Sequence, residues 1–165
     1  MAPRSLPNLA LPSTDGTPVN LATLSGWSVV YAYPRTSPPN AAPIEGWDQI
    51  PGARGCTPQS CAFRDHHAEL LAVGFSHVFG ISTQSSEYQV EMATRLHLPF
   101  AVLSDELLLL ARALGLDTFD AGGMTLLKRT TLILHDGAVV HQMLTVDNPT
   151  ENASDVISWA TTNIV

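Results

Sequence analysis

Two cysteines stand close together in the chain and are the residues best suited to covalent chemistry. They are Cys56 and Cys61, in the stretch GCTPQSC, and the sequence holds no others. A thiol attacks as its thiolate, and only a few per cent of an ordinary cysteine is ionised near neutral pH. Thr57 and Pro58 predict a helix start, with Thr57 as the N-cap. Cys56 would then lie where unpaired N–H groups and the helix dipole favour an anion, which makes it the candidate nucleophile.

The spacing of the two cysteines bears on whether they can form a disulfide. Five residues along an α-helix separate two Cα atoms by roughly 8–9 Å, whereas a disulfide requires Cα atoms within about 7 Å. If Cys56 and Cys61 form a bond, the first turn of the helix must unwind. Such a pair suits a catalytic cycle with a closed and an opened state better than a permanent crosslink.

Two other interpretations of the cysteines stay open on spacing alone. Free cysteines are often buried and can simply belong to the core. Alternatively, His66 and His67 could join Cys56 and Cys61 as zinc ligands. Gaps of four and five residues along one helix point these side chains to different faces, and adjacent histidines do not easily share one metal. We therefore expect no metal at this site.

The rest of the sequence predicts the elements that position the cysteines. Strands are expected where β-branched and aromatic residues gather, and helices where apolar residues recur at helical spacing between capping residues. His135-Asp136-Gly137 is typical of a hairpin turn. The expected strands are 27–33, 77–82, 100–103, 129–134 and 138–145, and the expected helices are 21–24, 57–73, 85–97, 105–114 and 150–163.

The order of these elements predicts the fold class. Strands and helices alternate as far as residue 114, and an antiparallel hairpin and a last helix follow. We therefore expect an α/β protein with a mixed central β-sheet flanked by helices on both faces. The length of 165 residues suits a single domain, 1–165. The segment 34–55 carries five prolines and three glycines, so it is expected to be a long surface loop.

The composition excludes several classes of partner. The formal net charge is −7 and no basic patch is present, which argues against nucleic acid and against an anionic membrane surface. The longest apolar run, 107–116, has half of the roughly 20 residues that a membrane span needs. The first residues lack the apolar core of a signal peptide. A cytoplasmic protein is expected, and there a close cysteine pair favours redox chemistry or metal binding.

Several segments, in order along the chain, resemble one known family. The stretch GCTPQSCAFRD at 55–65 resembles the active-site helix of peroxiredoxins, specifically the PrxQ or bacterioferritin comigratory protein subgroup. In that subgroup the resolving cysteine follows the peroxidatic cysteine by five residues. The other matching segments are LPSTDGTPVNLATLSG at 11–26, VVYAYP at 29–34, GISTQS at 80–85, LPFAVLSD at 98–105 and KRTTLILHDGAVV at 128–140.

This resemblance implies a thioredoxin-like fold and a thiol peroxidase that uses no cofactor. Cys56 resembles the peroxidatic cysteine and Cys61 the resolving one, which implies an intramolecular disulfide. Arg129 resembles the arginine that holds the thiolate and the peroxide, and Pro34 the proline that shields the thiolate. The implied partners are a peroxide substrate and a thioredoxin-type reductant, and the implied assembly is a monomer or a homodimer.

The chain departs from the family at one position that matters for chemistry. The family has a threonine or serine three residues before the cysteine, and its hydroxyl contacts the thiolate and the peroxide. Here that position is Ala53, and the segment between Pro34 and the cysteine is much longer than in the family. We expect Thr36 to supply the missing hydroxyl, with Ser37 as the alternative. The inserted residues 35–53 could form a lid over the thiol or a docking surface for a reductase.

Two rival functions fit a cysteine pair on such a fold. One is a general dithiol–disulfide oxidoreductase, although the spacing is C-x4-C rather than C-x-x-C and no proline stands just ahead of strand 129–134. The other is a redox sensor, or a binding module without catalysis. The loss of the hydroxyl at Ala53 keeps this second class open.

Overall fold

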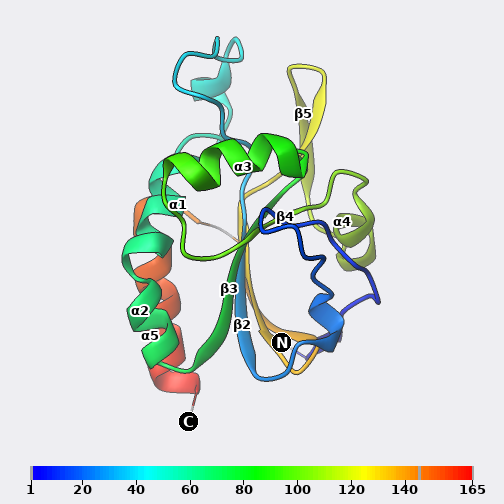
Figure 1. Ribbon diagram of the computed structural model, residues 1–165, viewed down its shortest axis with the longest axis vertical. Helices are drawn as coiled ribbons and strands as arrows, with labels where there is room; N and C mark the ends of the chain where they lie inside the picture. Colours follow the sequence, from blue (N-terminus) through cyan, green and yellow to red (C-terminus); the bar gives the residue numbers. More distant parts are fainter. Residues whose placement is uncertain (1, 145, 165) are drawn as a thin grey trace.

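A six-stranded mixed sheet forms the centre of the protein, whose computed structural model describes residues 2–144 and 146–164 (Figure 1). The strands lie in the order β1-β8-β7-β2-β3-β4. Their bounds are Arg4–Ser5 for β1, Trp27–Ala32 for β2, Phe75–Ser82 for β3, Val102–Ser104 for β4, Thr130–His135 for β7 and Ala138–Met143 for β8.

The pairing of the strands follows from how they are connected. β2, β3 and β4 are parallel, because helical crossovers join each of them to the next. β7 pairs antiparallel with both β2 and β8, and the tight turn at Asp136-Gly137 links β7 to β8. The expected α/β class, with a mixed sheet and the 135–137 hairpin, is confirmed.

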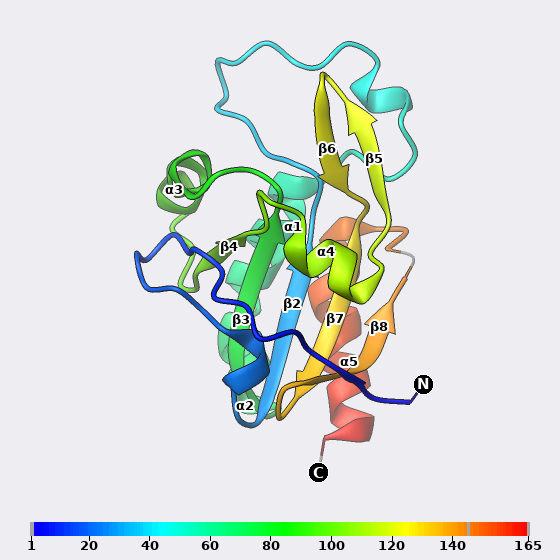
Figure 2. The same cartoon turned by 90° about the vertical axis from the view of Figure 1, so that its right-hand side faces the viewer.

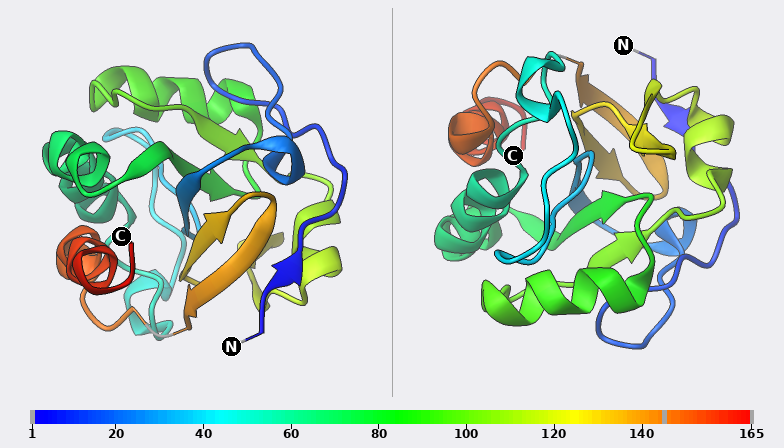
Figure 3. Two further views of the ribbon diagram at one scale, coloured as in Figure 1. Left: turned by 90° about the horizontal axis from the view of Figure 1, so that it is seen from below. Right: turned by 90° about the horizontal axis from the view of Figure 1, so that it is seen from above.

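Alternation along β2 divides the core between the two faces of the sheet. Val29 and Tyr31 belong to one buried cluster, whereas Val30 and Ala32 belong to the other. The first face is covered by helices α1 (Cys56–Asp65), α2 (His67–Ala72) and α5 (Asn152–Asn163). The second is covered by helix α4 (Leu109–Leu114) and the N-terminal segment, as the end-on views show (Figure 3). Helix α3 (Ser86–Arg95) lies beside β4.

The α-helices are α1 (Cys56–Asp65), α2 (His67–Ala72), α3 (Ser86–Arg95), α4 (Leu109–Leu114) and α5 (Asn152–Asn163). The described residues also form the short 3-10 helices η1 (Leu21–Thr23), η2 (Trp47–Gln49) and η3 (Pro149–Glu151). None of the helices in the described ranges is long and apolar enough to cross a membrane.

A second hairpin, which the sequence analysis did not predict, stands beside the long 35–53 loop (Figure 2). It consists of β5 (Thr118–Ala121) and β6 (Met124–Leu127). The two strands are joined by Gly122 and Gly123, both at positive φ, as a tight hairpin turn requires. The Trp47 and Phe119 rings lie 6.2 Å apart between centroids, so the hairpin supports the loop.

Two expected helices differ from those observed. The helix expected to run unbroken over 57–73 is divided at His66. His66 Nδ1 lies 2.9 Å from the Ala62 carbonyl oxygen, so the side chain competes with backbone N–H groups for this acceptor. The helix expected from residue 105 begins only at Leu109. Asp105 still caps it, because its carboxylate accepts hydrogen bonds from the N–H groups of Leu110 and Ala111.

Candidate active site

Cys56 is the first residue of α1, and Gly55 is the N-cap. The prediction that Thr57 caps this helix is therefore wrong: the helix begins one residue earlier, and Pro58 is tolerated because the first turn has no intrahelical acceptors for its N–H groups. Gly55 has φ +98°, and a Cβ there would lie 2.8 Å from Pro149 Cγ. Both facts require glycine immediately before the cysteine.

Arg129, which directly precedes β7, contacts the Cys56 sulfur. Its Nη2 lies 3.2 Å from Cys56 Sγ, and the residue is only 6% exposed. The same nitrogen also lies 3.3, 3.3 and 2.9 Å from the carbonyl oxygens of Gly52, Ala53 and Arg54, which share its two N–H donors with the sulfur. These acceptors are neutral, so the buried guanidinium favours a negative charge on the sulfur.

A buried polar network holds Arg129 from the other side. Arg129 Nη1 donates to the Gln59 side-chain oxygen, and Gln59 Nε2 donates in turn to Asn152 Oδ1 at 3.0 Å. Thr131 Oγ1 donates to the same Asn152 oxygen at 2.7 Å. Gln59, Asn152 and Thr131 are at most 1% exposed. This network joins α1, β7 and α5, and therefore fixes the arginine relative to the cysteine.

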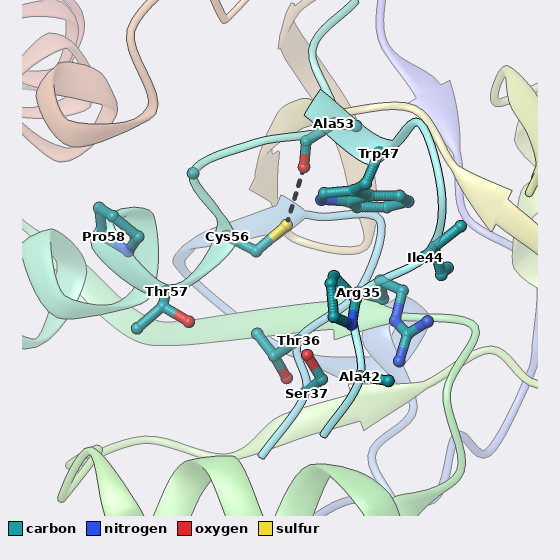
Figure 4. Close-up of a pocket in the computed structure, with 12 residues that line it drawn as sticks. Arg35, Thr36, Ser37, Ala42, Ile44, Trp47, Ala53, Cys56, Thr57 and Pro58 are labelled. Carbon is teal, nitrogen blue, oxygen red and sulfur yellow. Dashed lines mark hydrogen bonds between the residues drawn. The ribbon is translucent and has the colours of Figure 1, made fainter. Parts of the chain in front are cut away.

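A pocket of about 210 Å³ opens above Cys56, between the start of α1 and the inserted loop (Figure 4). The lining residues are Arg35, Thr36, Ser37, Ala42, Pro43, Ile44, Trp47, Ala53, Gly55, Cys56, Thr57 and Pro58. Four of them, Ala42, Pro43, Ile44 and Trp47, come from the middle of the insertion. The insertion thus forms part of the wall over the thiol, as a lid would.

Thr36 lines this pocket and is firmly held. Its N–H donates to Gln84 Oε1 at 3.0 Å, and Gln84 Nε2 donates back to the Thr36 carbonyl at 2.8 Å. The Thr36 hydroxyl is buried without a hydrogen-bond partner among the described residues. A buried hydroxyl without a partner costs free energy, so a ligand oxygen in the pocket would be a favourable partner for it.

The other residues expected near the thiol occupy different places. Pro34 is buried at the end of β2 but does not line the pocket. Ser37 lines the pocket and is half-buried. At Ala53 the backbone takes part instead of a side-chain hydroxyl, because the thiol of Cys56 lies 3.6 Å from the Ala53 carbonyl oxygen (Figure 4).

Cys61 lies in the same helix as Cys56, and both thiols are free. Cys61 is half-buried against the cluster on the α1 face of the sheet. Since α1 is continuous between the two cysteines, a disulfide between them requires the helix to open.

Two buried tyrosines join the sheet to the helices around the site, Tyr31 to α1 and Tyr33 to α3. Burial raises the pKa of Tyr31 above its ordinary value, so the phenol stays protonated near neutral pH and donates to Ser60 Oγ at 2.9 Å. The Tyr31 ring also stacks on Phe63, with centroids 4.4 Å apart. Burial likewise raises the pKa of Tyr33, which donates to Gln89. The contacts of Tyr31 must loosen if the helix opens around Ser60.

The geometry offers little support for a zinc site. Within residues 2–144 and 146–164, no three His, Cys, Asp or Glu side chains gather closely enough to hold a metal ion. His66 Nδ1 is engaged with the Ala62 carbonyl.

Comparison with known proteins assigns the chain to a family. The sequence model of the Redoxin family matches residues 2–157. The chain belongs to the Redoxin family. Its similar relatives include peroxiredoxin Q of Sedum lineare, 39% identical over 101 residues that make up 61% of this chain and 46% of the relative. Peroxiredoxin Bcp of Escherichia coli is 38% identical over 101 residues, which make up 61% of this chain and 54% of the relative.

These curated relatives match over about half of their own length. Solved structures match over nearly the whole chain. Peroxidoxin BcpB of Mycobacterium tuberculosis has a TM-score of 0.76 at 24% identity, covering 99% of this chain and 97% of its own. Peroxiredoxin Q of Xanthomonas campestris has a TM-score of 0.74 at 24% identity, covering 97% and 96%. The thioredoxin-like fold and the resemblance to the PrxQ and Bcp subgroup are confirmed.

The amides of Gln59 and Asn152, which support the site, were not predicted from the sequence. Gln59 and Asn152 lie 93 residues apart and meet only through the tertiary fold. The first turn of α1 gave a signal for Gln59, since a long polar side chain one helical turn after Cys56 shares its face. For Asn152 and Gln84 no local pattern was available.

Proposed function

We propose that the protein is a thiol peroxidase in which Cys56 is the nucleophile. The Cys56 thiolate attacks the terminal oxygen of a hydroperoxide, the O–O bond breaks, and the departing oxygen takes up a proton to leave as an alcohol or water. The sulfur is oxidised to sulfenic acid and the peroxide is reduced. Arg129 and the free N–H groups at the start of α1 stabilise the charge that develops on the departing oxygen.

Cys61 then resolves the sulfenic acid. After α1 opens, the Cys61 thiolate attacks the Cys56 sulfur and the S–O bond of the sulfenic acid breaks. The departing hydroxide takes up a proton to leave as water, and an intramolecular disulfide forms. A thioredoxin-type dithiol donates two electrons and two protons, which restores both thiols. The substrate is thus a hydroperoxide and the partner a thioredoxin-type reductant, and no cofactor takes part.

One observation carries this proposal: Arg129 Nη2 lies 3.2 Å from Cys56 Sγ, and Cys56 lines a pocket that opens beside the start of α1. A core thiol has no need of a buried guanidinium. Pro34, which does not line the pocket, would act by supporting the loop that carries Thr36. The single domain 1–165, the cytoplasmic location and the assembly as monomer or homodimer stay predictions.

Peroxide consumption, coupled to NADPH oxidation through thioredoxin and its reductase, tests the proposal. We expect turnover by the unchanged protein, no turnover by Cys56→Ser, and a single round of peroxide reduction by Cys61→Ser. Full turnover by Cys56→Ser would contradict the assignment of the nucleophile. Sustained turnover of Cys61→Ser with thioredoxin would contradict the resolving role of Cys61 and would leave the assignment of Cys56 as nucleophile unaffected.

A redox sensor is the second candidate, and Ala53 is the observation that favours it. Without a side-chain hydroxyl at this position, peroxide reduction could be slow enough for signalling rather than for peroxide removal. In the same assay a sensor would form the Cys56–Cys61 disulfide once and would be reduced by thioredoxin too slowly to sustain NADPH oxidation. A general dithiol oxidoreductase would instead reduce protein disulfides without added peroxide.

A further inference from the structure

The pocket above Cys56 is larger than hydrogen peroxide requires. Hydrogen peroxide has two heavy atoms, and two molecules of water occupy about 60 Å³ in the liquid. The pocket has a volume of about 210 Å³. Most of it would be unfilled by hydrogen peroxide, so the shape of the pocket suits a peroxide with a substituent.

One wall of the pocket is apolar and comes from the inserted loop. Trp47 and Ile44 both line it. The Trp47 ring packs against Phe119 of β5, and a Cβ added at Gly122 would lie 3.0 Å from Ile44 Cδ1, so the hairpin backs both side chains. Figure 4 shows Trp47 and Ile44 on the insertion side of the pocket, facing the Cys56 side. An apolar substituent would lose contact with water against this wall.

Arg35 supplies a charge to the same pocket. Among the described lining residues it is the one charged side chain, and it is half-buried. Its Nη2 lies 3.3 Å from the Tyr88 hydroxyl, and within residues 2–144 and 146–164 it forms no ion pair with a carboxylate. In Figure 4 its guanidinium lies on the same side as Ile44, away from Cys56. A planar guanidinium that has a neutral hydroxyl but no carboxylate as its partner suits a carboxylate ligand.

Resting on the proposed peroxidase function, we propose that the substrate class is an organic hydroperoxide with a compact apolar body and a carboxylate. The peroxide group meets Cys56, Trp47 and Ile44 contact the apolar body, and Arg35 binds the carboxylate. Arg35 and Trp47 are then the residues that determine specificity, and the insertion acts as a substrate-selecting lid.

A matched pair of peroxides tests the role of Arg35. Cumene hydroperoxide and its para-carboxylate differ only in the charged group. We expect kcat/KM to be about tenfold higher for the carboxylate, the size of one charge-assisted hydrogen bond. Arg35→Gln should reduce this ratio to about one, and Arg35→Lys should keep part of it. Arg112→Gln, which removes an exposed arginine of α4, should leave the ratio unchanged. A ratio of one in the unchanged protein, or no response to Arg35→Gln, overturns the proposal.

Trp47→Ala tests the apolar wall. We expect kcat/KM for cumene hydroperoxide to fall about tenfold relative to that for hydrogen peroxide, because the wall contacts only the substituent. Leu107→Ala removes a leucine that is 71% exposed and does not line this pocket, and serves as the control. If the ratio of kcat/KM for cumene hydroperoxide to that for hydrogen peroxide is unchanged in Trp47→Ala, the role given to the apolar wall is overturned.

A binding measurement separates this inference from the proposed function. Cumyl alcohol and its para-carboxylate have no peroxide bond, so their affinity, measured by ligand-observed NMR, does not depend on catalysis. We expect the carboxylate to bind about tenfold more tightly and Arg35→Gln to remove the difference. If no peroxide is consumed but this pattern is found, the peroxidase proposal fails and the pocket assignment holds. Equal affinities for the two alcohols overturn the pocket assignment whatever the catalytic result.

Discussion

At the scale of single residues, the candidate site pairs the buried guanidinium of Arg129 with the sulfur of Cys56. Arg129 is 6% exposed, and its neutral partners are backbone carbonyls and the Gln59 amide. Burial without a carboxylate makes the guanidinium costly. In the proposed mechanism a thiolate at the Cys56 sulfur, 3.2 Å away, would offset that cost, and the guanidinium would then stabilise the negative charge on the departing oxygen.

Replacing Arg129 by methionine should remove this effect while keeping most of the volume. We expect kcat/KM for peroxide to fall by about 100-fold, since the loss of one donor to a developing oxyanion has that size. Arg129→Lys should be intermediate, because lysine keeps the charge but cannot donate to Gln59 and the sulfur together. Stopped-flow kinetics on the reduced protein would measure this, with Arg112→Met as the control. A loss of less than twofold in Arg129→Met would exclude the role given to Arg129.

Thr36→Val should separate stability from activity. The Thr36 hydroxyl is buried without a partner among the described residues, so its removal should raise the free energy of unfolding by about 1 kcal/mol. If the hydroxyl binds the peroxide, kcat/KM should fall about tenfold in the same variant and recover in Thr36→Ser. Urea unfolding and peroxide kinetics would measure the two effects. A variant that loses stability and keeps its rate would show that the hydroxyl serves the fold instead.

At the scale of elements, the start of α1 decides where the thiol lies. Gly55→Ala would place a Cβ at φ +98° and 2.8 Å from Pro149 Cγ. We expect a loss of about 2 kcal/mol or more in the free energy of unfolding, together with slower reaction of Cys56, because helix α1 must shift. Gly52→Ala is the matched control. Gly52 has φ +77°, but a Cβ there would meet no atom within 4 Å. This variant should therefore lose only the free energy that a positive φ costs an alanine, about 1 kcal/mol. Equal losses in urea unfolding would refute the close contact with Pro149.

Most elements of the sheet could be predicted because their sequences are distinctive. The apolar β-branched runs of β2, β3 and β7 and the Asp136-Gly137 turn carry strong local signals. The β5–β6 hairpin has a recognisable turn signal in Gly122-Gly123. Its strands, however, alternate only weakly between apolar and polar residues, so the hairpin was not predicted. The division of the helix at His66 had no such signal, since it depends on a side-chain hydrogen bond to Ala62.

The candidate site was predictable only where its chemistry is local. Cys56, Cys61 and Arg129 stand in recognisable motifs. Thr36 lines the pocket, and its role toward a peroxide stays a prediction. The carbonyls of Gly52, Ala53 and Arg54, which converge on Arg129, have no side-chain signature. Long-range partners such as Asn152 become neighbours only after α5 packs on α1.

At the scale of the whole molecule, three groups make stability depend on pH. Burial lowers the pKa of His67 and of His141 below the ordinary value of 6.5. Hydrogen bonds from the Ser13 hydroxyl and the Thr17 N–H lower the pKa of Asp15 below 3.8. In each case the unfolded chain binds the proton more readily, so the stability is present above the ordinary pKa and is lost as the pH falls.

We therefore expect the free energy of unfolding to decrease as the pH falls below about 6.5, and further below about 4. Urea unfolding at a series of pH values would measure this, and His141→Gln should weaken the dependence in the upper range. A stability that rises as the pH is lowered from 7 to 5 would contradict the lowered pKa values of the half-buried His67 and His141.

Helix α1 begins at one end of the mixed sheet (Figure 1). Cys56, which contacts Arg129 and lines the pocket, is its first residue, and Cys61 lies within the same helix. The central claim is that peroxide oxidises Cys56 first and that Cys61 captures the product. Mass spectrometry after one equivalent of peroxide tests it most directly. We predict a Cys56–Cys61 disulfide in the unchanged protein, one added oxygen on Cys56 in Cys61→Ser, and no oxidation in Cys56→Ser. Oxidation of Cys61 in Cys56→Ser at the wild-type rate would contradict the account.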